Sequence, residues 1–245
     1  MVKDAQPNGT KLLFASNSQM TLQPHLYHDL GYDAFSDFVP ISQTMRSEVA
    51  FAVGGKSPVH SIKELIAWLK ANPSQALYGS PGIGTGPHVA GLEFARLSGL
   101  DFRHAPYKGT PAALPDVLAG RIPLYTALTA ELLEQHKSGA IRILATAGAA
   151  RSPFLPDVPT LRQNGIEIEA PGWFAFYAPA GTPEDIVARL EKEIVAATNA
   201  PEMRTKIETM GYLPTGTTSD ALRTIQRADF ERWGPIVKAS SFQIE

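Results

Sequence analysis

Short apolar runs alternate along the chain with stretches of helical periodicity, and this alternation predicts the secondary structure. The apolar runs predict strands at Lys11–Asn17, Phe38–Gly54, Gln75–Ser80, Asp101–Tyr107, Ile122–Leu128, Ile141–Gly148 and Pro171–Ala178. Helical spacing predicts helices at Ser61–Asn72, His88–Leu97, Thr110–Leu118, Ala130–Gly139, Ile186–Val195, Pro201–Met210 and Ser219–Lys238.

Local signals support several of these helix boundaries. Ser61 and Glu64 form a capping-box pattern at one start, and Asn72-Pro73 is typical of a helix stop. Thr110-Pro111 is predicted as a cap followed by proline in the first helical position.

The order of the elements predicts an α/β fold. Strand and helix alternate regularly over 57–148, which favours a mostly parallel sheet covered by helices. A proline-containing loop over 151–165 then breaks the rhythm. We therefore expect two α/β lobes, the first formed by 1–56 with 149–245 and the second by 57–148.

A glycine-rich stretch, YGSPGIGTGPHVAG at 78–91, joins a predicted strand to a predicted helix. Glycine lets backbone N–H groups approach a ligand, and the first turn of a helix leaves such donors unpaired beside a partial positive charge. Gly82, Gly84 and Thr85 are thus candidates for holding a phosphate or a carboxylate. Alternatively, the glycines form a turn that binds nothing.

Nucleotide motifs do not fit this loop. Pro87 stands where the third glycine of G-x-G-x-x-G would be, and no Gly-Lys-Ser/Thr follows as in a Walker loop. A second turn suited to anions, Pro106–Pro111, follows the next predicted strand. In a parallel sheet both turns emerge at the carboxyl edge, where such sheets bind ligands, so the pair strengthens the ligand hypothesis.

Composition narrows the function further. The 245 residues are 44% hydrophobic, with a formal net charge of −2 and no run of basic side chains, which argues against nucleic acid as a partner. No cysteine is present, and no segment has the apolar length of a membrane helix, so no direct membrane insertion is expected. The first residues, MVKDAQPNGTK, lack the apolar core of a signal peptide.

Four segments of the chain together resemble one protein family. The longest is YGSPGIGTGPHVAGLEFARLSGLDFRHAPYKGTPAALPDVLAGRI at 78–122. The others are NGTKLLFASNSQMTLQPHLYHDLGYDAFSDFVPIS at 8–42, LATAGAARSPFLPDVPTLRQNGI at 144–166 and WFAFYAPAGTPEDIVARLEKEI at 173–194. With these segments the sequence resembles the Bug or TctC family, the extracytoplasmic solute-binding receptors of tripartite tricarboxylate transporters.

The resemblance implies a two-lobed fold of the periplasmic-binding-protein type II class, with mostly parallel sheets and crossing hinge strands that close like a Venus flytrap. It implies capture of a small carboxylate (a di- or tricarboxylate, an amino acid or an aromatic acid) in the periplasm and delivery to membrane permease subunits. It implies no catalysis and no cofactor. Family members normally carry an export signal and a Pro-Gly-Gly loop before the point matched by Met1, so the first lobe is expected to be N-terminally truncated.

The resemblance also implies ligand-binding positions. They are Ser16, Asn17 and Ser18 in the first lobe, Ser80, Gly82, Gly84, Thr85 and His88 around the glycine-rich loop, Tyr107 and Lys108 in the second turn, Thr126, and Trp173. Several of them also have a plainer interpretation. Ser16–Ser18 fit an ordinary polar turn, His88 fits packing or capping, Lys108 fits a solvated charge, and Trp173 fits the core.

Other hypotheses remain open at the level of sequence. An α/β enzyme acting on an anionic substrate would need an acid and a base converging on Gly82–Thr85, and Ser80 lacks the leading glycine of G-x-S-x-G. A degenerate fragment that folds but binds weakly is a third alternative. His25 and His28 have helical spacing but no third ligand, so we treat them as surface residues rather than a metal site.

Overall fold

The chain divides into two compact units in the computed structural model, which describes residues 2–240, 242 and 244. The first unit consists of Met1–Arg46 and Gly172–Glu245, and the second of Ser47–Pro171. The chain enters the second unit within strand β2 (Phe38–Gly54) and leaves it at the start of strand β7 (Pro171–Pro179).

The boundaries expected after residues 56 and 148 both lie inside the second unit. The reason is the pairing of the neighbouring backbone. The second half of β2 forms antiparallel ladders with two strands of the second unit, and the N–H of Val49 donates to the carbonyl of Ala170 at 3.1 Å. These hydrogen bonds tie 47–54 and 149–170 to the second unit.

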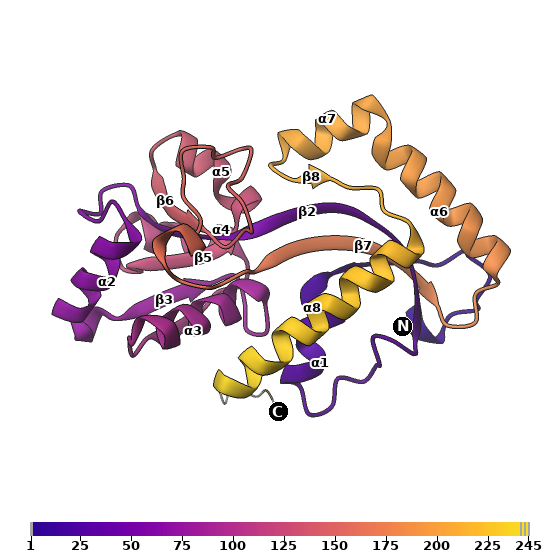
Figure 1. Ribbon diagram of the computed structural model, residues 1–245, viewed down its shortest axis with the longest axis horizontal. Helices are drawn as coiled ribbons and strands as arrows, with labels where there is room; N and C mark the ends of the chain where they lie inside the picture. Colours follow the sequence, from indigo (N-terminus) through magenta and orange to yellow (C-terminus); the bar gives the residue numbers. More distant parts are fainter. Residues whose placement is uncertain (1, 241, 243, 245) are drawn as a thin grey trace. The chain divides into compact units, whose positions relative to one another are not determined.

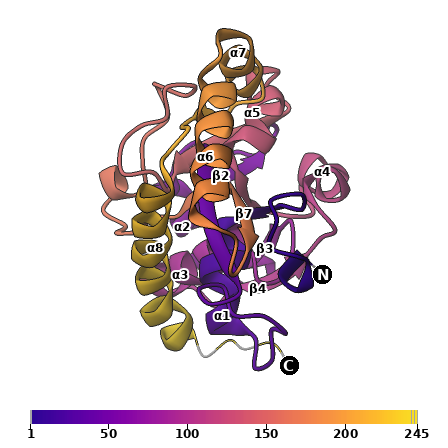
Figure 2. The same cartoon turned by 90° about the vertical axis from the view of Figure 1, so that its right-hand side faces the viewer.

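The first unit combines antiparallel strand pairs with long helices (Figures 1 and 2). Besides the first part of β2 and most of β7, its elements are a short 3₁₀ turn (Val2–Asp4), β1 (Leu13–Ser16), a π-helix (Ser18–Leu22), α1 (Gln23–Leu26), α6 (Glu184–Asn199), α7 (Pro201–Thr209), β8 (Leu213–Pro214) and α8 (Ser219–Ser240). β1 pairs with β7, and β8 pairs with β2. α8 packs against the π-helix and α1.

The second unit holds the regular strand–helix alternation that the sequence predicts. After β2 it contains α2 (Ile62–Ala71), a 3₁₀ turn (Pro73–Gln75), β3 (Leu77–Ser80), α3 (Gly86–Ser98), β4 (Arg103–Pro106), α4 (Thr110–Leu118), β5 (Leu124–Leu128), α5 (Thr129–Lys137), β6 (Ile141–Thr146) and a 3₁₀ turn (Arg162–Asn164). β3 lies between β4 and β5 and is parallel to both, whereas β2 is antiparallel to β5 and β6. The sheet of this unit is therefore mixed rather than mostly parallel as predicted, because β2 runs antiparallel to its neighbours. The strand pairs described in the first unit are antiparallel.

Helix starts follow the predicted caps with one exception. The Ser61 hydroxyl accepts a hydrogen bond from the N–H of Glu64 at 3.2 Å, and the Glu64 carboxylate accepts from the N–H of His60. The cap of α4 lies one residue before the predicted one, because Gly109 with φ +88° is the N-cap and Thr110 is already helical. Pro111 thus occupies the second helical position.

Neighbouring residues of β3 point to opposite faces of the sheet of the second unit, as in any strand. The Tyr78 ring lies against Gly91 of α3, whereas a side chain at Gly79 would meet the rings of Tyr125 and Tyr107. Tyr125 belongs to the core cluster that α4 and α5 cover. α3 and α4 therefore pack on opposite faces of β3.

The first unit has its own core, and Trp173 of β7 is at its centre. The Trp173 side chain is buried with Met20, Phe38 and Leu222. Its indole N–H donates to a carboxylate oxygen of Asp229 on α8 at 2.6 Å. A buried polar group needs such a partner, so this bond fastens α8 to the strands.

We expect Gly91→Ala to destabilise the fold, although alanine in an open helix stabilises by about 1 kcal/mol relative to glycine. A methyl group at Gly91 would lie 2.2 Å from the Tyr78 ring. Overpacking of this kind costs about 1–3 kcal/mol. Urea unfolding of Gly91→Ala, of Tyr78→Leu and of the double variant measures the effect, and the double variant should recover part of the loss. A more stable Gly91→Ala would contradict this packing.

Candidate functional site

The two turns that the sequence singles out emerge side by side in the second unit. β3 and β4 are parallel and in register, with Ser80 opposite Pro106 at their ends. The chain then enters the loop before α3 from one strand and the loop before α4 from the other. The N–H of Gly109 donates to the carbonyl of Pro81 at 2.9 Å, which ties the two turns together. Both helix N-termini thus lie at the carboxyl edge of this sheet.

Hydrogen bonds within the glycine-rich loop hold its backbone in one conformation. The carbonyl of Gly82 accepts from the hydroxyls of Ser80 at 3.2 Å and Thr85 at 2.8 Å. Thr85 also caps α3, because its hydroxyl accepts from the N–H of His88 at 3.3 Å. Gly84 has φ +71°, a conformation that favours glycine. The side chains predicted to bind a ligand therefore shape the loop.

The loop presents backbone donors. Within the described part of the chain, no hydrogen bond to protein is found for the N–H groups of Gly82, Ile83 and Thr85. The Ile83 side chain is 46% exposed, so the loop is open to solvent there. Unpaired N–H groups beside a helix N-terminus are the donors that an anion requires.

Beneath the loop lies a stack of aromatic rings. The rings of His88 and His104 are stacked with their centroids 4.1 Å apart, and the His104 ring stacks on Tyr78 with a centroid distance of 4.7 Å. His104 Nε2 lies 2.8 Å from the Ser80 hydroxyl, and the N–H of Gly84 donates to His88 Nδ1 at 3.3 Å. His88 is buried and supports the loop from below, which fits the packing interpretation of this residue.

Burial keeps both histidines uncharged. It lowers the pKa of His88 to about 3, with a further contribution from His104, and the pKa of His104 to about 4. At neutral pH the support of the loop therefore carries no charge, and the donors that face solvent are backbone dipoles.

The N-terminus of α4 borders a cavity of about 380 Å³ that contains an acidic side chain. Glu131 of α5 lines this cavity and accepts a hydrogen bond from the hydroxyl of Thr110, which in turn accepts from the Tyr125 hydroxyl at 3.1 Å. Burial raises the pKa of Glu131, and the bond from Thr110 partly opposes this. The Glu131 carboxyl group thus lies beside Thr110, the first helical residue of α4.

The side chains of the second turn, Tyr107 and Lys108, have contacts of their own or face solvent. The Tyr107 hydroxyl donates to Asp116 at 2.8 Å, and burial, with a smaller effect of Asp116, raises the pKa of Tyr107 to about 12. The Lys108 side chain is exposed, as a solvated charge would be. The turn thus positions α4 against the glycine-rich loop.

Thr126 and Trp173 are buried by their own units. The Thr126 hydroxyl lies within hydrogen-bond distance of the carbonyls of Gly79 at 3.2 Å and Pro87 at 2.9 Å, which joins β5 to β3 and to the first turn of α3. Trp173 is 2% exposed in the core of the first unit. The contacts of both side chains favour structural roles.

In the first unit, Ser16, Asn17 and Ser18 form the turn from β1 into the π-helix. The backbone N–H of Ser16 donates to the side chain of Gln19 at 3.0 Å. The Asn17 side chain is buried and accepts from the N–H of Trp173 at 3.4 Å. This is the polar turn that the sequence allowed, built on a π-helix, an element frequent at functional sites.

Sequence reasoning missed His104 and Glu131, and it did not connect Thr110 with Glu131. His104 stands in the predicted strand before the second turn, and its alternation with Ala105 places it on the face that packs α3. Glu131 stands in the first turn of the helix that follows β5, at the same carboxyl edge. Because β5 is parallel to β3, the turn after β5 lies at the same edge as the turn with Thr110, and this rule could have indicated Glu131.

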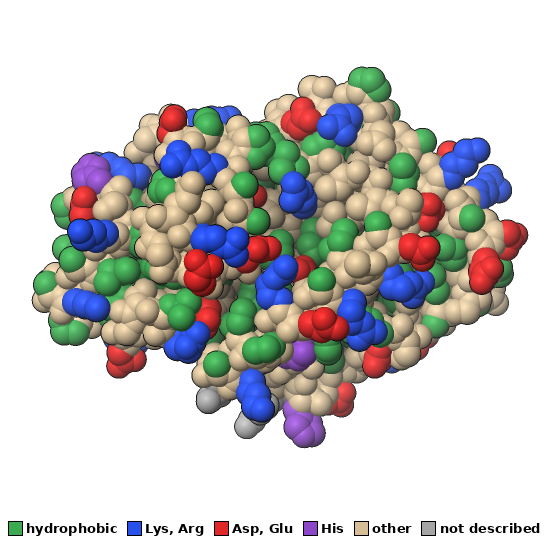
Figure 3. All heavy atoms as spheres, viewed as in Figure 1, with side chains coloured by type: hydrophobic (Ala, Val, Ile, Leu, Met, Phe, Trp, Pro, Cys, Tyr) green, Lys and Arg blue, Asp and Glu red, His purple; other side chains and the backbone are tan. Residues whose placement is uncertain are grey.

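Two features of other protein classes, a metal-ligand cluster and a membrane-spanning helix, are absent from the described residues. No group of three metal-ligating side chains occurs among the described residues, and His25 packs on Phe230 at 4.0 Å between ring centroids. In the same part of the chain, no helix has both the length and the apolar character needed to cross a bilayer. On the face shown in Figure 3, acidic and basic side chains are interspersed.

A comparison with protein families decides the relationship. The model of the TctC family, described as "Tripartite tricarboxylate transporter family receptor", matches residues 1–242. The chain belongs to this family. It is 30% identical over 210 residues to a UPF0065 protein of Bordetella bronchiseptica, a match that covers 86% of the chain and 62% of that relative. The chain thus spans less than two thirds of this relative's length.

Solved structures of family members have the same fold. The periplasmic binding protein BugD superposes with a TM-score of 0.89 at 27% identity, covering 100% of this chain and 82% of BugD. Rpa4515 of R. palustris, solved with adipate, superposes with a TM-score of 0.91 at 26% identity. The match covers 99% of this chain and 81% of Rpa4515. These likenesses confirm the predicted two-lobed α/β fold class. The family is one of receptors, which agrees with the prediction that this protein is not an enzyme.

We expect the buried His88 and the half-buried His104 to make the fold less stable as the pH falls from 6.5 towards 5. Unfolded histidine titrates near 6.5, so in this range the unfolded chain binds protons that the folded chain does not. Each histidine contributes at most about 1.4 kcal/mol per pH unit.

The variant His104→Gln keeps a hydrogen-bonding group near Ser80 but removes one titration. A plot of Tm against pH should therefore be shallower for His104→Gln than for the wild type. His28→Gln, at an exposed position, serves as the control and should keep the wild-type slope. Equal slopes for all three proteins would mean that His104 does not titrate in this way.

Proposed function

We propose that this protein is a solute-binding receptor that captures a small carboxylate at the glycine-rich loop Ser80–Gly86. The proposal rests on family membership and on the donors of that loop. The structure of a relative with adipate supports a dicarboxylate as the kind of ligand. Periplasmic location and transfer of the ligand to membrane permease subunits are part of the same proposal, because the family is named for receptors of tripartite transporters.

The observation that carries the proposal is the set of backbone N–H groups at Gly82, Ile83 and Thr85. A carboxylate accepts two or more hydrogen bonds and gains from the partial positive charge at the start of α3. Such charge-assisted bonds are about twice as strong as neutral ones. The loop is already held by Ser80 and Thr85, so little conformational entropy is lost when a ligand binds.

Of the two turns, the glycine-rich loop is the better candidate for the carboxylate site, and the cavity at α4 gives the reason. Glu131 lines that cavity, and an ionised Glu131 would repel a second carboxylate there. Among the described residues, no acidic side chain is hydrogen-bonded to Gly82, Ile83 or Thr85. We therefore assign the carboxylate to the start of α3. Tyr107 and Lys108 belong to the second turn, which lies next to this loop.

A titration of the folded chain with adipate tests the proposal. A ligand at 100 times its Kd stabilises the folded state by about 2.7 kcal/mol. For a chain of this size, that raises Tm by about 5–10 °C. Isothermal calorimetry with adipate, other dicarboxylates and acidic amino acids supplies the affinities. No heat and no Tm shift with any of them would contradict the proposal.

Gly82→Ala connects the binding to the loop. The added methyl group would meet the Thr85 side chain at 3.5 Å, an ordinary contact, so the fold should tolerate it. It would also cover the approach to the loop amides, and we expect the affinity to fall by about tenfold. Calorimetry measures the affinity, and urea unfolding measures the stability.

The matched control is Gly99→Ala at the end of α3. Gly99 has φ +61°, and we expect about 1 kcal/mol of lost stability with unchanged affinity. An unchanged affinity in Gly82→Ala would remove the glycine-rich loop from the site.

A further inference from the structure

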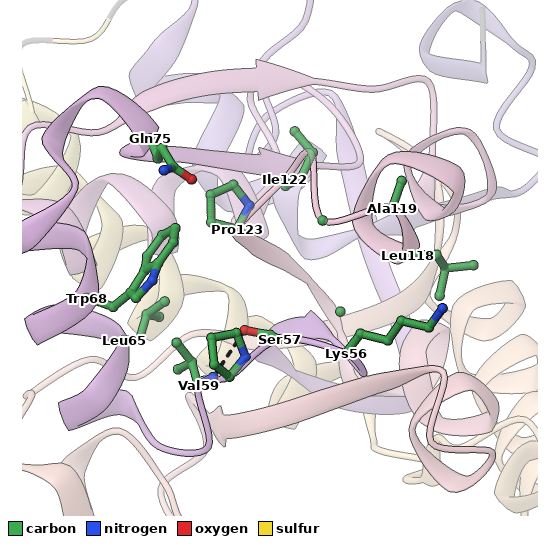
Figure 4. A pocket seen from close by; sticks show the side chains of 13 residues that line it. Lys56, Ser57, Val59, Leu65, Trp68, Gln75, Leu118, Ala119, Ile122 and Pro123 are labelled. Carbon is green, nitrogen blue, oxygen red and sulfur yellow. Dashed lines mark hydrogen bonds between the residues drawn. The ribbon is translucent and has the colours of Figure 1, made fainter.

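A second cavity lies in the second unit, at the opposite edge of the sheet from the glycine-rich loop. It has a volume of about 270 Å³ and is lined by the segment after β2, by α2, by the end of α4 and by the residues before β5 (Figure 4). Gly54 ends β2 opposite Ile141, the first residue of β6. Gln75 and Pro123 shortly precede the parallel strands β3 and β5. The cavity is therefore at the amino edge of these strands, one strand length from Ser80.

The rim of this cavity is fixed in place. The guanidinium of Arg142 on β6 donates to the carbonyls of Gly55 at 3.3 Å, Ser57 at 3.2 Å and Val59 at 2.9 Å. The Ser57 hydroxyl also accepts from the N–H of Val59 at 3.2 Å. The loop between β2 and α2 is thus held by side-chain bonds, and the cavity is formed before any ligand arrives.

The lining is chiefly apolar and includes one aromatic ring. In Figure 4 the indole of Trp68 lies beside Leu65 and Val59, with Ile122 and Pro123 on the far side of the cavity. A cavity of about 150 Å³ in an apolar interior holds a benzene ring. The larger volume here fits a single ring with a short substituent. A ring stacked on an indole gains about 0.5–1.5 kcal/mol beyond the burial of its surface.

Lys56 is the charged residue of the lining. Its side chain extends along the rim towards Leu118. No ion pair or side-chain hydrogen bond of Lys56 is found in the described residues. An ammonium group at the mouth of an apolar cavity complements an anionic group on an apolar ligand.

We infer that this cavity binds a small aromatic carboxylate, with the ring against Trp68 and the carboxylate at Lys56. The position and chemistry of this site are separate from those of the loop Ser80–Gly86. Aromatic stacking and a lysine define it, whereas backbone amides define the proposed receptor site. The inference therefore does not depend on the proposed function.

Amide NMR of the folded chain tests this inference with phenylacetate as the probe. The chain has three tryptophans, so three indole N–H signals report on three places. The Trp68 signal should shift on titration with phenylacetate, and the signals of the buried Trp173 and Trp233 should stay in place. Phenylacetamide, which lacks the charge, and benzylamine, which reverses it, should bind more weakly.

Two variants address the assigned contacts. Lys56→Gln removes the charge at the rim and should weaken phenylacetate about twofold to fivefold, with no change for phenylacetamide. Trp68→Leu keeps an apolar side chain and should weaken both compounds about threefold to tenfold. Lys70→Gln is the matched control, because Lys70 is exposed on α2, the helix that carries Trp68, and does not line the cavity.

The outcomes separate this site from the receptor site. The inference stands if phenylacetate shifts the Trp68 signal and if Lys56→Gln, but not Gly82→Ala, lowers the affinity for phenylacetate. This holds whether or not adipate binds. Equal binding of phenylacetate to the wild type, Lys56→Gln and Trp68→Leu overturns the inference. So does an unmoved Trp68 signal at about 10 mM phenylacetate, a concentration above even a weak millimolar Kd. Lys56→Gln suffices for this decision if Trp68→Leu does not fold.

Discussion

The parallel register between β3 and β4 is the constraint on which the candidate site depends. Because Ser80 lies opposite Pro106, the two helices that follow these strands must start side by side. The bond from the N–H of Gly109 to the carbonyl of Pro81 then fixes one loop against the other. A slip in register would move the start of α4 by about 3.3 Å per residue and break this bond. The donors of the glycine-rich loop owe their position to strand pairing rather than to any single side chain.

The side chains around this loop serve it in a way that residue types alone do not reveal. Ser80, Thr85 and His88 bond to the loop backbone, and the His88–His104–Tyr78 stack fills the space beneath it. Because burial keeps both histidines neutral, they support the loop without adding a charge that would have to be desolvated. An anion held by backbone dipoles above neutral side chains needs no lysine. The exposure of Lys108 to solvent beside the loop fits this arrangement.

Much of this architecture could be predicted from the sequence, and the rest has identifiable causes. Periodicity predicted the strands and helices of the second unit, because each has an apolar face and a clear cap such as Ser61 marks a helix start. The unit boundaries were displaced because the 17-residue β2 is one continuous strand, and periodicity does not tell which half pairs with which partners. The family resemblance implied ligand contacts for Thr126 and Trp173, but their hydrogen-bond partners lie 39 and 56 positions away in the sequence. Such long-range partners leave no local signal, and the same holds for the bond between Thr110 and Glu131.

The two edges of the sheet in the second unit differ in the kind of group that they can hold. At the carboxyl edge, helices begin, and their unpaired N–H groups favour compact, strongly hydrated anions. At the amino edge, α4 ends and its last carbonyls are already bonded, by the N–H groups of Gly120 and Arg121 for example. The N-termini of α3 and α4 do not point to this edge, and apolar side chains such as Leu65 and Trp68 line the cavity. The direction of the parallel strands thus assigns polar recognition to one edge and apolar recognition to the other.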